Sequence, residues 1–430
     1  ETSTDIKLPP NVRKVIYPFG VKLKLADGIE KYCQIHSMEE ARKAIKSGEK
    51  NIIIKGNEGA GKVSEDSSFI LFQRLFKEYS DKNINIYIQG GAGIHSSAAT
   101  LALGAKGVIM DSQLAMFPEC SASAEFKTLC KSLSGSETSV IDNFRVLVRN
   151  NTPKLPTNPE YSDILTYLGC QDISKNYLPL GQDVALSADL VENYKNLPEL
   201  VAGFYESVYG HLLQAKKLKS IQADNKLAKS LGIKYPVAQG PMARVSDVPE
   251  FAASIAEDGA LPFVAMSTAR GDAARSLLDE TSKLLGEKTW GVGILGFMPA
   301  QLRDEQTKYI LEIKPKVVLI AGGRPSLAQP FEKAGIKTFL HVPSVALLDM
   351  FLKEGSKNFI FEGRESGGHI GPLSSLVLWE RQINRLLKEE ELNSISVFFA
   401  GGIHDAFSSA LVSIMSATLA AKGAKIGILM

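Results

Sequence analysis

The stretch Asn358-Phe-Ile-Phe-Glu-Gly-Arg-Glu-Ser-Gly-Gly-His-Ile-Gly-Pro372 joins an apolar run directly to a glycine-rich turn. The apolar run at its start is typical of a buried strand. Gly367 and Gly368 have no side chain, so a flat or anionic ligand can approach the backbone closely there. His369 follows at once and can exchange a proton near neutral pH. A strand end, a glycine pair and a histidine together predict an active site.

The same segment has an altered copy upstream, Gly56-Asn-Glu-Gly-Ala-Gly-Lys-Val-Ser64. Residues Ser37–Arg74 align with Ser344–Arg381 without a gap, since 344 − 37 and 381 − 74 both equal 307. This offset far exceeds a solenoid period of roughly 20–50 residues, so it indicates two whole domains with a linker.

A second landmark supports the duplication. Gly93-Ile-His95 matches Gly402-Ile-His404 at an offset of 404 − 95 = 309. The copies differ where chemistry is expected, because Ala60 and Lys62 replace the first glycine and the histidine of the downstream motif. We interpret the second copy as the working one and the first as degenerate.

Length and composition bound the protein class. At 430 residues the chain exceeds one ordinary core and predicts two domains or more. Hydrophobic residues make up 44% and charged residues 22%, as in soluble globular proteins. A net charge of +2 predicts no strong attraction to nucleic acid or to an anionic membrane. No apolar run is long enough to span a bilayer, and no secretory signal opens the chain.

The four cysteines form no C-x-x-C pair, which argues against zinc or thioredoxin-type chemistry and predicts no metal site. Reduced, incidental thiols in a cytoplasmic protein are the simplest interpretation. No cysteine follows Cys170, so the second domain lacks the nucleophile of cysteine-dependent barrel enzymes.

From Leu231 onward, short apolar strands alternate with amphipathic helical stretches. This alternation is typical of a parallel sheet, and eight repeats predict a TIM (β/α)8 barrel. A doubly wound open sheet is the structural alternative. The expected strands are Pro236–Gln239, Leu261–Met266, Trp290–Leu295, Lys316–Ile320, Lys337–Val342, Asn358–Phe361, Ser396–Phe399 and Lys425–Met430.

The first domain shows only the later strands of this pattern. We expect residues 1–125 to be the C-terminal half of a degenerate barrel whose earlier strands precede Glu1. We expect residues 126–230, with a Pro/Asn-rich patch at Asn150–Pro159, to be a mainly helical accessory or linker segment. We expect residues 231–430 to be the second barrel, truncated just after strand eight. The expected early strands are Val15–Pro18, Tyr32–Ile35, Asn51–Ile54, Ile84–Ile88 and Gly107–Met110.

In parallel barrels, ligands bind at the C-terminal ends of the strands. In the second domain these ends carry Gln239-Gly-Pro-Met242, Glu365-Ser-Gly-Gly-His369 and Ala400-Gly-Gly-Ile403. Glycine amides after strand seven are suited to a phosphate. Each motif also has a structural alternative. The glycine pair could be a plain turn, the first motif a plug at the barrel bottom, and His369 a structural histidine. We expect His404 to cap the helix that follows it.

Those three motifs in this order resemble the nitronate monooxygenase (2-nitropropane dioxygenase) family, which includes the FMN-dependent enoyl-acyl-carrier-protein reductases. The resemblance covers Leu231 to Met430, and Lys14 to about Cys120 as a degenerate partial copy. The sequence of Phe361–Pro372, followed by Leu378-Trp-Glu380, is similar to the corresponding sequence of tandem barrels in polyketide or polyunsaturated fatty-acid synthase-like proteins.

The resemblance implies a flavoprotein with non-covalent FMN at the barrel mouth. Cofactor-binding residues would be Gln239, Gly240, Pro241, Met242, Glu365, Gly367, Gly368, Gly401 and Gly402. His369 matches the family histidine proposed as the acid/base. The family's asparagine at the end of strand three is replaced by Gly291-Val-Gly-Ile-Leu-Gly296, and its glycine and hydroxyl after strand eight would fall beyond Met430.

The expected function is therefore an FMN-dependent oxidoreductase, in which the flavin carries the redox step. Its substrate is a nitronate, with oxygen reoxidising the flavin, or an enoyl thioester on an acyl carrier protein, with NAD(P)H as electron donor. Other domains of the same megasynthase are the expected partners. Two rival interpretations stay open: a non-catalytic scaffold barrel, and a barrel that binds a phosphorylated metabolite without redox chemistry.

The proton-transfer role of His369 is directly testable. The variant His369→Gln is expected to lose turnover and to keep its flavin, because the amide preserves polarity but cannot carry a proton at neutral pH. Turnover with each substrate and the flavin absorbance are the measurements. Unchanged turnover would remove His369 from the mechanism.

Overall fold

The computed structural model describes residues 3–5, 8–150, 161–170, 172–368 and 370–430. The chain divides into two compact units, Glu1–Tyr209 and Gly210–Met430. The division falls within the long helix α7 (Leu197–Leu218). The expected three-part division at residues 125 and 230 stays a prediction.

The C-terminal unit is an eight-stranded parallel barrel. Its sheet order is β11-β18-β17-β16-β15-β14-β13-β12, so each strand lies beside its neighbour in the chain except at the closure. The strands are β11 (Val237–Ala238), β12 (Phe263–Ala265), β13 (Gly291–Leu295), β14 (Val317–Ala321), β15 (Lys337–His341), β16 (Asn358–Glu362), β17 (Ser396–Ala400) and β18 (Lys425–Leu429). All eight predicted strands are confirmed.

The barrel closes between its first two strands. Ala238 forms a parallel bridge with Leu261, just ahead of β12. The Leu261 N–H donates to the Val237 carbonyl at 2.9 Å, and the Gln239 N–H donates to the Leu261 carbonyl at 2.9 Å. A doubly wound sheet has two free edges, so this closure excludes the open-sheet alternative.

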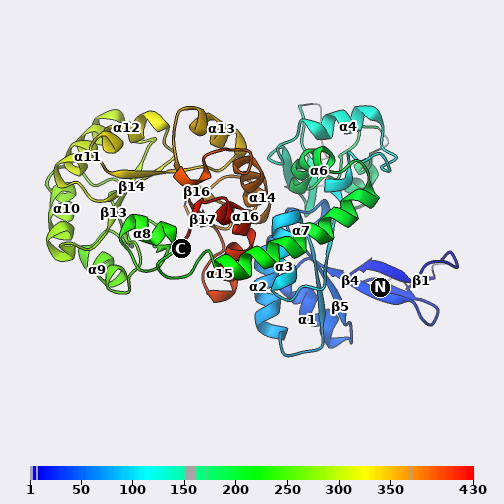
Figure 1. The fold of residues 1–430 in the computed structure, drawn as a ribbon. Coiled ribbons are helices and arrows are strands. Elements are labelled where there is room, and N and C mark those ends of the chain that lie inside the picture. Colours follow the sequence, from blue (N-terminus) through cyan, green and yellow to red (C-terminus); the bar gives the residue numbers. More distant parts are fainter. Residues whose placement is uncertain (1–2, 6–7, 151–160, 171, 369) are drawn as a thin grey trace. The chain divides into compact units, whose positions relative to one another are not determined.

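Helices surround the strands on the outside of the barrel (Figure 1). Their inner faces are apolar, as in α14, where Trp379 is fully buried and its Nε1 donates to the Phe361 carbonyl at 3.0 Å. The helices of this unit after α7 are α8 (Lys226–Leu231), α9 (Pro249–Glu257), α10 (Gly271–Leu285), α11 (Ala300–Ile313), α12 (Pro325–Lys333), α13 (Val345–Lys353), α14 (Ser375–Leu386), η3 (Leu392–Ser394), α15 (Ala406–Met415) and α16 (Ala417–Ala421).

Aromatic side chains fill the barrel interior. Phe339 and Phe398 lie on strands that are not adjacent, yet their ring centroids are 5.0 Å apart. Phe263 and Phe398 each stand beside an interior glycine, Gly291 and Gly427, on the neighbouring strand. A Cβ at either glycine would lie 2.5–2.6 Å from the phenyl ring. The interior is thus a packed core and not a channel.

The N-terminal unit contains a curled half-barrel of five parallel strands in the order β2-β4-β5-β7-β8. These match the five strands predicted for the degenerate copy. Helices α1 (Met38–Lys46), α2 (Ser68–Tyr79) and α3 (Ile94–Ala102) follow the strands. The strands are β2 (Lys14–Pro18), β4 (Glu30–Ile35), β5 (Asn51–Lys55), β7 (Asn85–Gln89) and β8 (Gly107–Ile109).

The duplication is visible in the element bounds. Adding 307 to the bounds of α1, β5 and α2 gives those of α13, β16 and α14. After α2 the offset grows, because β7 ends at Gln89 and β17 at Ala400, so 400 − 89 = 311. The match of Gly93–His95 to Gly402–His404 was therefore wrong by two residues. His95 is buried inside α3, whereas His404 is exposed ahead of α15.

The rest of the N-terminal unit is built from short elements. The Pro/Asn-rich patch lies outside the described residues, apart from Asn150. Within the described part of the chain, no helix combines the length and the apolar character that crossing a membrane requires. The short elements are β1 (Ser3–Asp5), β3 (Lys22–Lys24), β6 (Gly61–Lys62), η1 (Ser112–Leu114), α4 (Ala124–Lys131), β9 (Thr138–Ile141), β10 (Phe144–Leu147), α5 (Tyr161–Tyr167), η2 (Gln182–Leu186) and α6 (Ser187–Asn193).

The aromatic interior gives a stability prediction. Phe398→Ala is expected to destabilise the barrel by about 3–5 kcal/mol, because the interior cannot collapse onto the missing ring. Both tryptophans, Trp290 and Trp379, lie in the barrel, so tryptophan fluorescence during denaturant unfolding reports on this unit. Leu284→Ala, at a half-exposed leucine of α10, is the control and is expected to cost far less. Equal losses in both variants would contradict the packed interior.

Candidate functional site

The predicted site residues gather at one sector of the barrel mouth. Gln239–Met242 follow β11, Glu365–Gly368 follow β16, and Gly401 and Gly402 follow β17. These strands are neighbours in the order β11-β18-β17-β16, and their C-terminal ends share one edge. His369 lies outside the described residues, so its position relative to this sector stays a prediction.

The turn after β11 lies over the mouth and is held by backbone contacts. The Gly240 N–H donates to the Met430 carbonyl at 2.8 Å, and the Gln239 Oε1 accepts from the Phe263 N–H at 3.1 Å. Pro241 packs above Gly293, where a Cβ would lie 2.2 Å from the Pro241 Cβ. This placement excludes the plug at the barrel bottom and leaves Met242 half exposed beside the opening.

Glu365 fixes the loop after β16. Its Oε2 accepts from the Ser375 N–H at 2.8 Å and from the Ser375 hydroxyl at 2.6 Å. The same hydroxyl is 3.2 Å from the Gly401 carbonyl. We call this arrangement the Glu365–Ser375 clasp. It ties the end of β16, the start of α14 and the end of β17 together, so Glu365 acts through position. Its predicted contact with a cofactor stays a prediction.

The glycines of the mouth have the backbone geometry expected of a ligand site. Gly368, Gly401 and Gly402 have φ of 86°, 122° and 72°, values that side chains rarely adopt. Among the described residues, a Cβ at Gly367 or Gly368 would meet nothing within 4 Å, and both glycines are exposed. Successive backbone N–H groups in such turns can form a concavity that binds anions.

His404 does not cap the following helix as predicted. The N-cap of α15 is Asp405, whose carboxylate accepts from the Ser408 N–H at 2.8 Å. The His404 backbone N–H donates to the Ser408 hydroxyl at 3.0 Å, and its Nε2 lies 3.7 Å from the Asp405 Oδ2. Its imidazole is 63% exposed. The prediction failed because a carboxylate one residue later is a stronger cap.

The first copy keeps the clasp. Glu58 accepts from the Ser68 N–H at 3.1 Å and from its hydroxyl at 2.5 Å, and this hydroxyl is 3.0 Å from the Gly90 carbonyl. Gly90 and Gly91 have φ of 107° and 65°, close to the values at the equivalent Gly401 and Gly402. The backbone of the candidate site is therefore present in both copies.

The first copy differs because its own chain fills the mouth. The Gln182 N–H donates to the Glu58 carbonyl at 2.8 Å. A Cβ at Gly181 would lie 3.0 Å from the Ala60 amide nitrogen, at the position where the second copy is open. Asp183 is fully buried. The Gly91 backbone N–H interacts with its carboxyl group and opposes the rise in pKa that burial causes. A buried carboxyl group thus faces the turn of the first copy that is equivalent to Gly401-Gly402.

Burial dominates the electrostatics of this filled mouth. It raises the pKa of Asp183 well above 3.8, and the neighbouring carboxylates of Asp111 and Glu58 add to the rise. Within the described residues, the Asp183 carboxylate makes no hydrogen bond of standard geometry. Burial also lowers the pKa of Lys55, and the charges of Asp111 and Asp183 oppose that shift.

These observations test whether the second mouth fits a phosphate-bearing flat cofactor such as FMN. The open face at Gly367 and Gly368 leaves room for a flat ring. The Gly401-Gly402 turn has the backbone form that faces a carboxylate in the first copy. The residues therefore fit the cofactor that the family resemblance implies.

Neither Ser375 nor Asp183 was predicted from the sequence as a site residue, although the shared serines Ser67-Ser68 and Ser374-Ser375 were a signal for the clasp.

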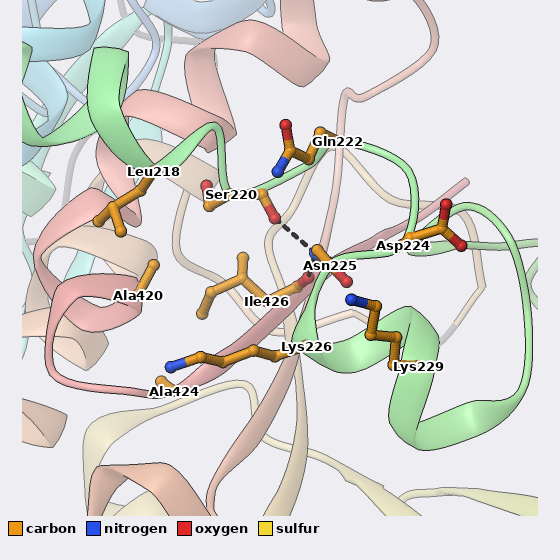
Figure 2. A pocket seen from close by; sticks show the side chains of 10 residues that line it. All are labelled: Leu218, Ser220, Gln222, Asp224, Asn225, Lys226, Lys229, Ala420, Ala424 and Ile426. Atoms are coloured by element: carbon orange, nitrogen blue, oxygen red, sulfur yellow. Dashed lines mark hydrogen bonds between the residues drawn. The ribbon is translucent and has the colours of Figure 1, made fainter.

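A pocket of about 250 Å³ lies elsewhere on the barrel unit (Figure 2). It is lined by Lys226 and Lys229 ahead of β11, by Ala424 ahead of β18 and by Ile426 near the start of β18, and so lies at the N-terminal ends of the strands. Asn225 Nδ2 closes part of its wall by donating to the Ser220 carbonyl at 2.5 Å and to the Ile426 carbonyl at 2.8 Å. This end of a barrel is associated with stability and not with catalysis.

Comparison with known proteins gives likeness to solved structures alone. No family model matches the chain, and no curated protein matches it. FabK from Thermotoga maritima is 29% identical over 47% of this chain and 60% of that one, with a TM-score of 0.40. Nitroalkane oxidase from Streptomyces ansochromogenes is 19% identical, covering 47% and 66%, with a TM-score of 0.39.

The enoyl reductase domain of MlnA, from the macrolactin biosynthesis cluster of Bacillus amyloliquefaciens, is 15% identical over 49% of this chain and 56% of that one, with a TM-score of 0.37. The chain spans less than two thirds of the length of each of these structures. At these TM-scores the likeness establishes neither a family nor an activity.

The filled mouth gives a pH prediction. The folded state holds the Asp183 proton more tightly than the unfolded chain, so the stability from this group is present below pH 3.8 and is lost as pH rises. Asp183→Asn does not titrate. Its gain in stability over the unaltered protein is expected to grow with pH, to about 1–3 kcal/mol near neutrality.

Thiol labelling measures this gain, because all four cysteines lie in the N-terminal unit. Cys33 and Cys130 are buried, which raises the pKa of each thiol to about 12, and they react once the unit unfolds. Labelling with dithiodipyridine in a urea series, from acid to neutral pH, gives the unfolding free energy. Asp81→Asn, at an exposed carboxylate, is the control. A gain independent of pH would contradict the raised pKa.

Proposed function

We propose that the C-terminal unit is a flavin-dependent oxidoreductase that holds FMN non-covalently at the barrel mouth. The observation that carries the proposal is the convergence of three glycine-containing strand ends in one sector of the barrel, on the adjacent strands β16 and β17 and on β11, which β18 separates from β17. The filled mouth of the first copy supports it, since the buried carboxyl group of Asp183 there faces the backbone turn equivalent to Gly401-Gly402.

Each group has a defined task in this proposal. The amides of Gly401 and Gly402 hold the phosphate. Gly367 and Gly368 form the surface against which the flat ring lies, and Pro241 and Met242 border it. The flavin, when bound, accepts or donates two electrons as a hydride equivalent. His369 exchanges a proton with the substrate near the ring.

Two reactions suit such a site. In the first, a nitronate would be oxidised, with oxygen as the final electron acceptor. In the second, NAD(P)H would supply the two electrons that reduce the enoyl thioester of an acyl carrier protein. We favour the nitronate monooxygenase type as the description of the site. The similarity of Phe361–Pro372 to barrels of polyketide and fatty-acid synthases makes the enoyl thioester the alternative for its biological role.

The scaffold interpretation suits the first copy better than the second. The mouth of the first copy is occupied by Gly181–Asp183, whereas Gly367 and Gly368 leave the corresponding surface open in the second. A colourless protein that binds a phosphorylated metabolite would instead favour the barrel without redox chemistry.

The decisive experiment is a visible absorbance spectrum of the purified full chain, followed by identification of any flavin released on denaturation. A flavin spectrum with released FMN is the expected result. A well-folded, colourless protein that cannot be reconstituted with FMN would falsify the proposal.

Gly367→Leu tests where the cofactor binds. The new side chain would meet no protein atom near its Cβ, so the fold is expected to be unaffected, but it would occupy the space of the flavin ring. FMN affinity is expected to fall at least about tenfold, while the melting temperature stays unchanged. Gly210→Leu, at an open position on α7, is the control and is expected to keep its affinity. Normal FMN binding by Gly367→Leu would place the flavin elsewhere.

A further inference from the structure

Two titratable side chains share the interior face of the barrel mouth. Phe339 and Ile360 belong to the interior core cluster. Side chains two residues apart on a strand point to the same face, so His341 on β15 and Glu362 on β16 also face the interior. Both are the last residues of their strands, one layer above the phenylalanine core. The sequence motifs did not point to His341.

The two side chains form a close pair. The His341 Nδ1 lies 2.6 Å from the Glu362 Oε2, and the side chains are 13% and 7% exposed. The distance is that of an ion pair, although the angle falls outside hydrogen-bond geometry. Both imidazole nitrogens are buried, and within the described residues neither has a hydrogen-bond partner of standard geometry. A buried polar atom without a partner is costly, so a bound molecule is expected to meet Nε2.

The first copy lacks this pair. Subtracting 307 places Gln34 and Lys55 at the positions of His341 and Glu362. Gln34 Nε2 donates to Gln89 Oε1 at 2.6 Å, and Gln89 Nε2 donates to an Asp111 carboxylate oxygen at 2.8 Å. Side chains of the filled copy thus satisfy one another. The open copy replaces them with a histidine whose Nδ1 faces a carboxylate and whose buried Nε2 has no hydrogen-bond partner of standard geometry among the described residues.

We propose that His341, positioned by Glu362, binds an sp² oxygen that carries or develops negative charge in a ligand at the barrel mouth. The carboxylate faces Nδ1 and leaves Nε2 for the ligand. When the ring is protonated, Nε2 is a hydrogen-bond donor, and hydrogen bonds to an anion are stronger than those to a neutral group. His341 then touches the substrate, whereas Glu362 is a positioning residue.

This inference rests on the proposed function for the identity of the substrate. The two proposed reactions share the required chemistry. A nitronate is an anion whose charge lies on sp² oxygens. Addition of hydride to an enoyl thioester places negative charge on the carbonyl oxygen, as in an enolate. A donor aimed at that oxygen stabilises the charge where it develops. The site would therefore select substrates by this oxygen and not by the rest of the chain.

The test compares two small probes of similar size and shape, one with a carboxylate and one with a neutral carboxamide. Crotonate carries an anionic sp² oxygen next to an enoyl group, and crotonamide is its neutral counterpart. Their dissociation constants are measured by ligand-detected NMR titration on the full chain, as purified and after loading with FMN. The unaltered protein is expected to bind crotonate at least about tenfold more tightly, the effect of one hydrogen bond to a charged group.

Variants of His341 and Glu362 distinguish the contribution of this pair to the binding preference from that of the rest of the barrel mouth. His341→Leu is expected to lose the preference for crotonate while its affinity for crotonamide stays the same. His341→Gln keeps an N–H donor and is expected to recover part of the preference. Glu362→Gln is expected to reduce the preference, because the ring loses its charged partner.

The matched control is His36→Gln in the first copy. His36 also pairs with a glutamate, with Nδ1 3.1 Å from the Glu40 Oε2, and is 4% exposed, but it belongs to the other unit. It is expected to keep the full preference. Retention of the preference by His341→Leu, or its absence in the unaltered protein, overturns the inference. Colourless protein with an intact preference would overturn the flavin proposal and leave the His341–Glu362 pair standing.

Discussion

The Glu365–Ser375 clasp is the constraint on which the candidate site depends. One carboxylate and one hydroxyl join the end of β16, the first turn of α14 and the end of β17. A Cβ at Gly363 would lie 2.1 Å from the Ser375 hydroxyl, so a glycine is required for the chain to pass. Because three elements meet at this point, the open glycines Gly367 and Gly368 are presented by a fixed frame.

The presence of the same clasp at Glu58 and Ser68 separates structure from function. The first copy keeps the clasp and the following glycine pair, yet its mouth is closed by Gly181–Asp183. The clasp is therefore a requirement of the fold and not of a ligand. What distinguishes the second copy is the open surface and the pair of His341 and Glu362. The two copies are an internal comparison in which the frame is constant and the lining of the mouth changes.

The sequence predicted the fold well because the relevant signals are local. Runs such as Val317–Ile320 and Ser396–Phe399 are buried on both faces, so their apolar character directly indicates strands. The gapless repetition reflects a shared local structure, since β5 and α2 have the same spacing as β16 and α14. The cap of α15 is Asp405, one residue after the predicted His404. A histidine that follows two glycines favoured the earlier position.

The candidate site was predictable only in part. Motifs at strand ends identified Gln239–Met242, Glu365 and the glycines, since parallel strands present their C-terminal ends together. The contact of His341 with Glu362 needs two residues 21 positions apart (362 − 341), and the closure of the first copy by Asp183 needs a partner much farther along the chain. Period-two alternation along β15 and β16 was the signal available for the pair.

The barrel interior has a consequence for how such a sequence can change. Phe263 faces Gly291 and Phe398 faces Gly427 on adjoining strands, and in each pair the ring occupies the space that a glycine leaves. Neither member can grow or shrink alone without a clash or a void. The combined side-chain volume of each phenylalanine and its glycine is thus constrained. We expect divergent copies of this barrel to change the two positions together, with a larger residue at one accompanied by a smaller residue at the other.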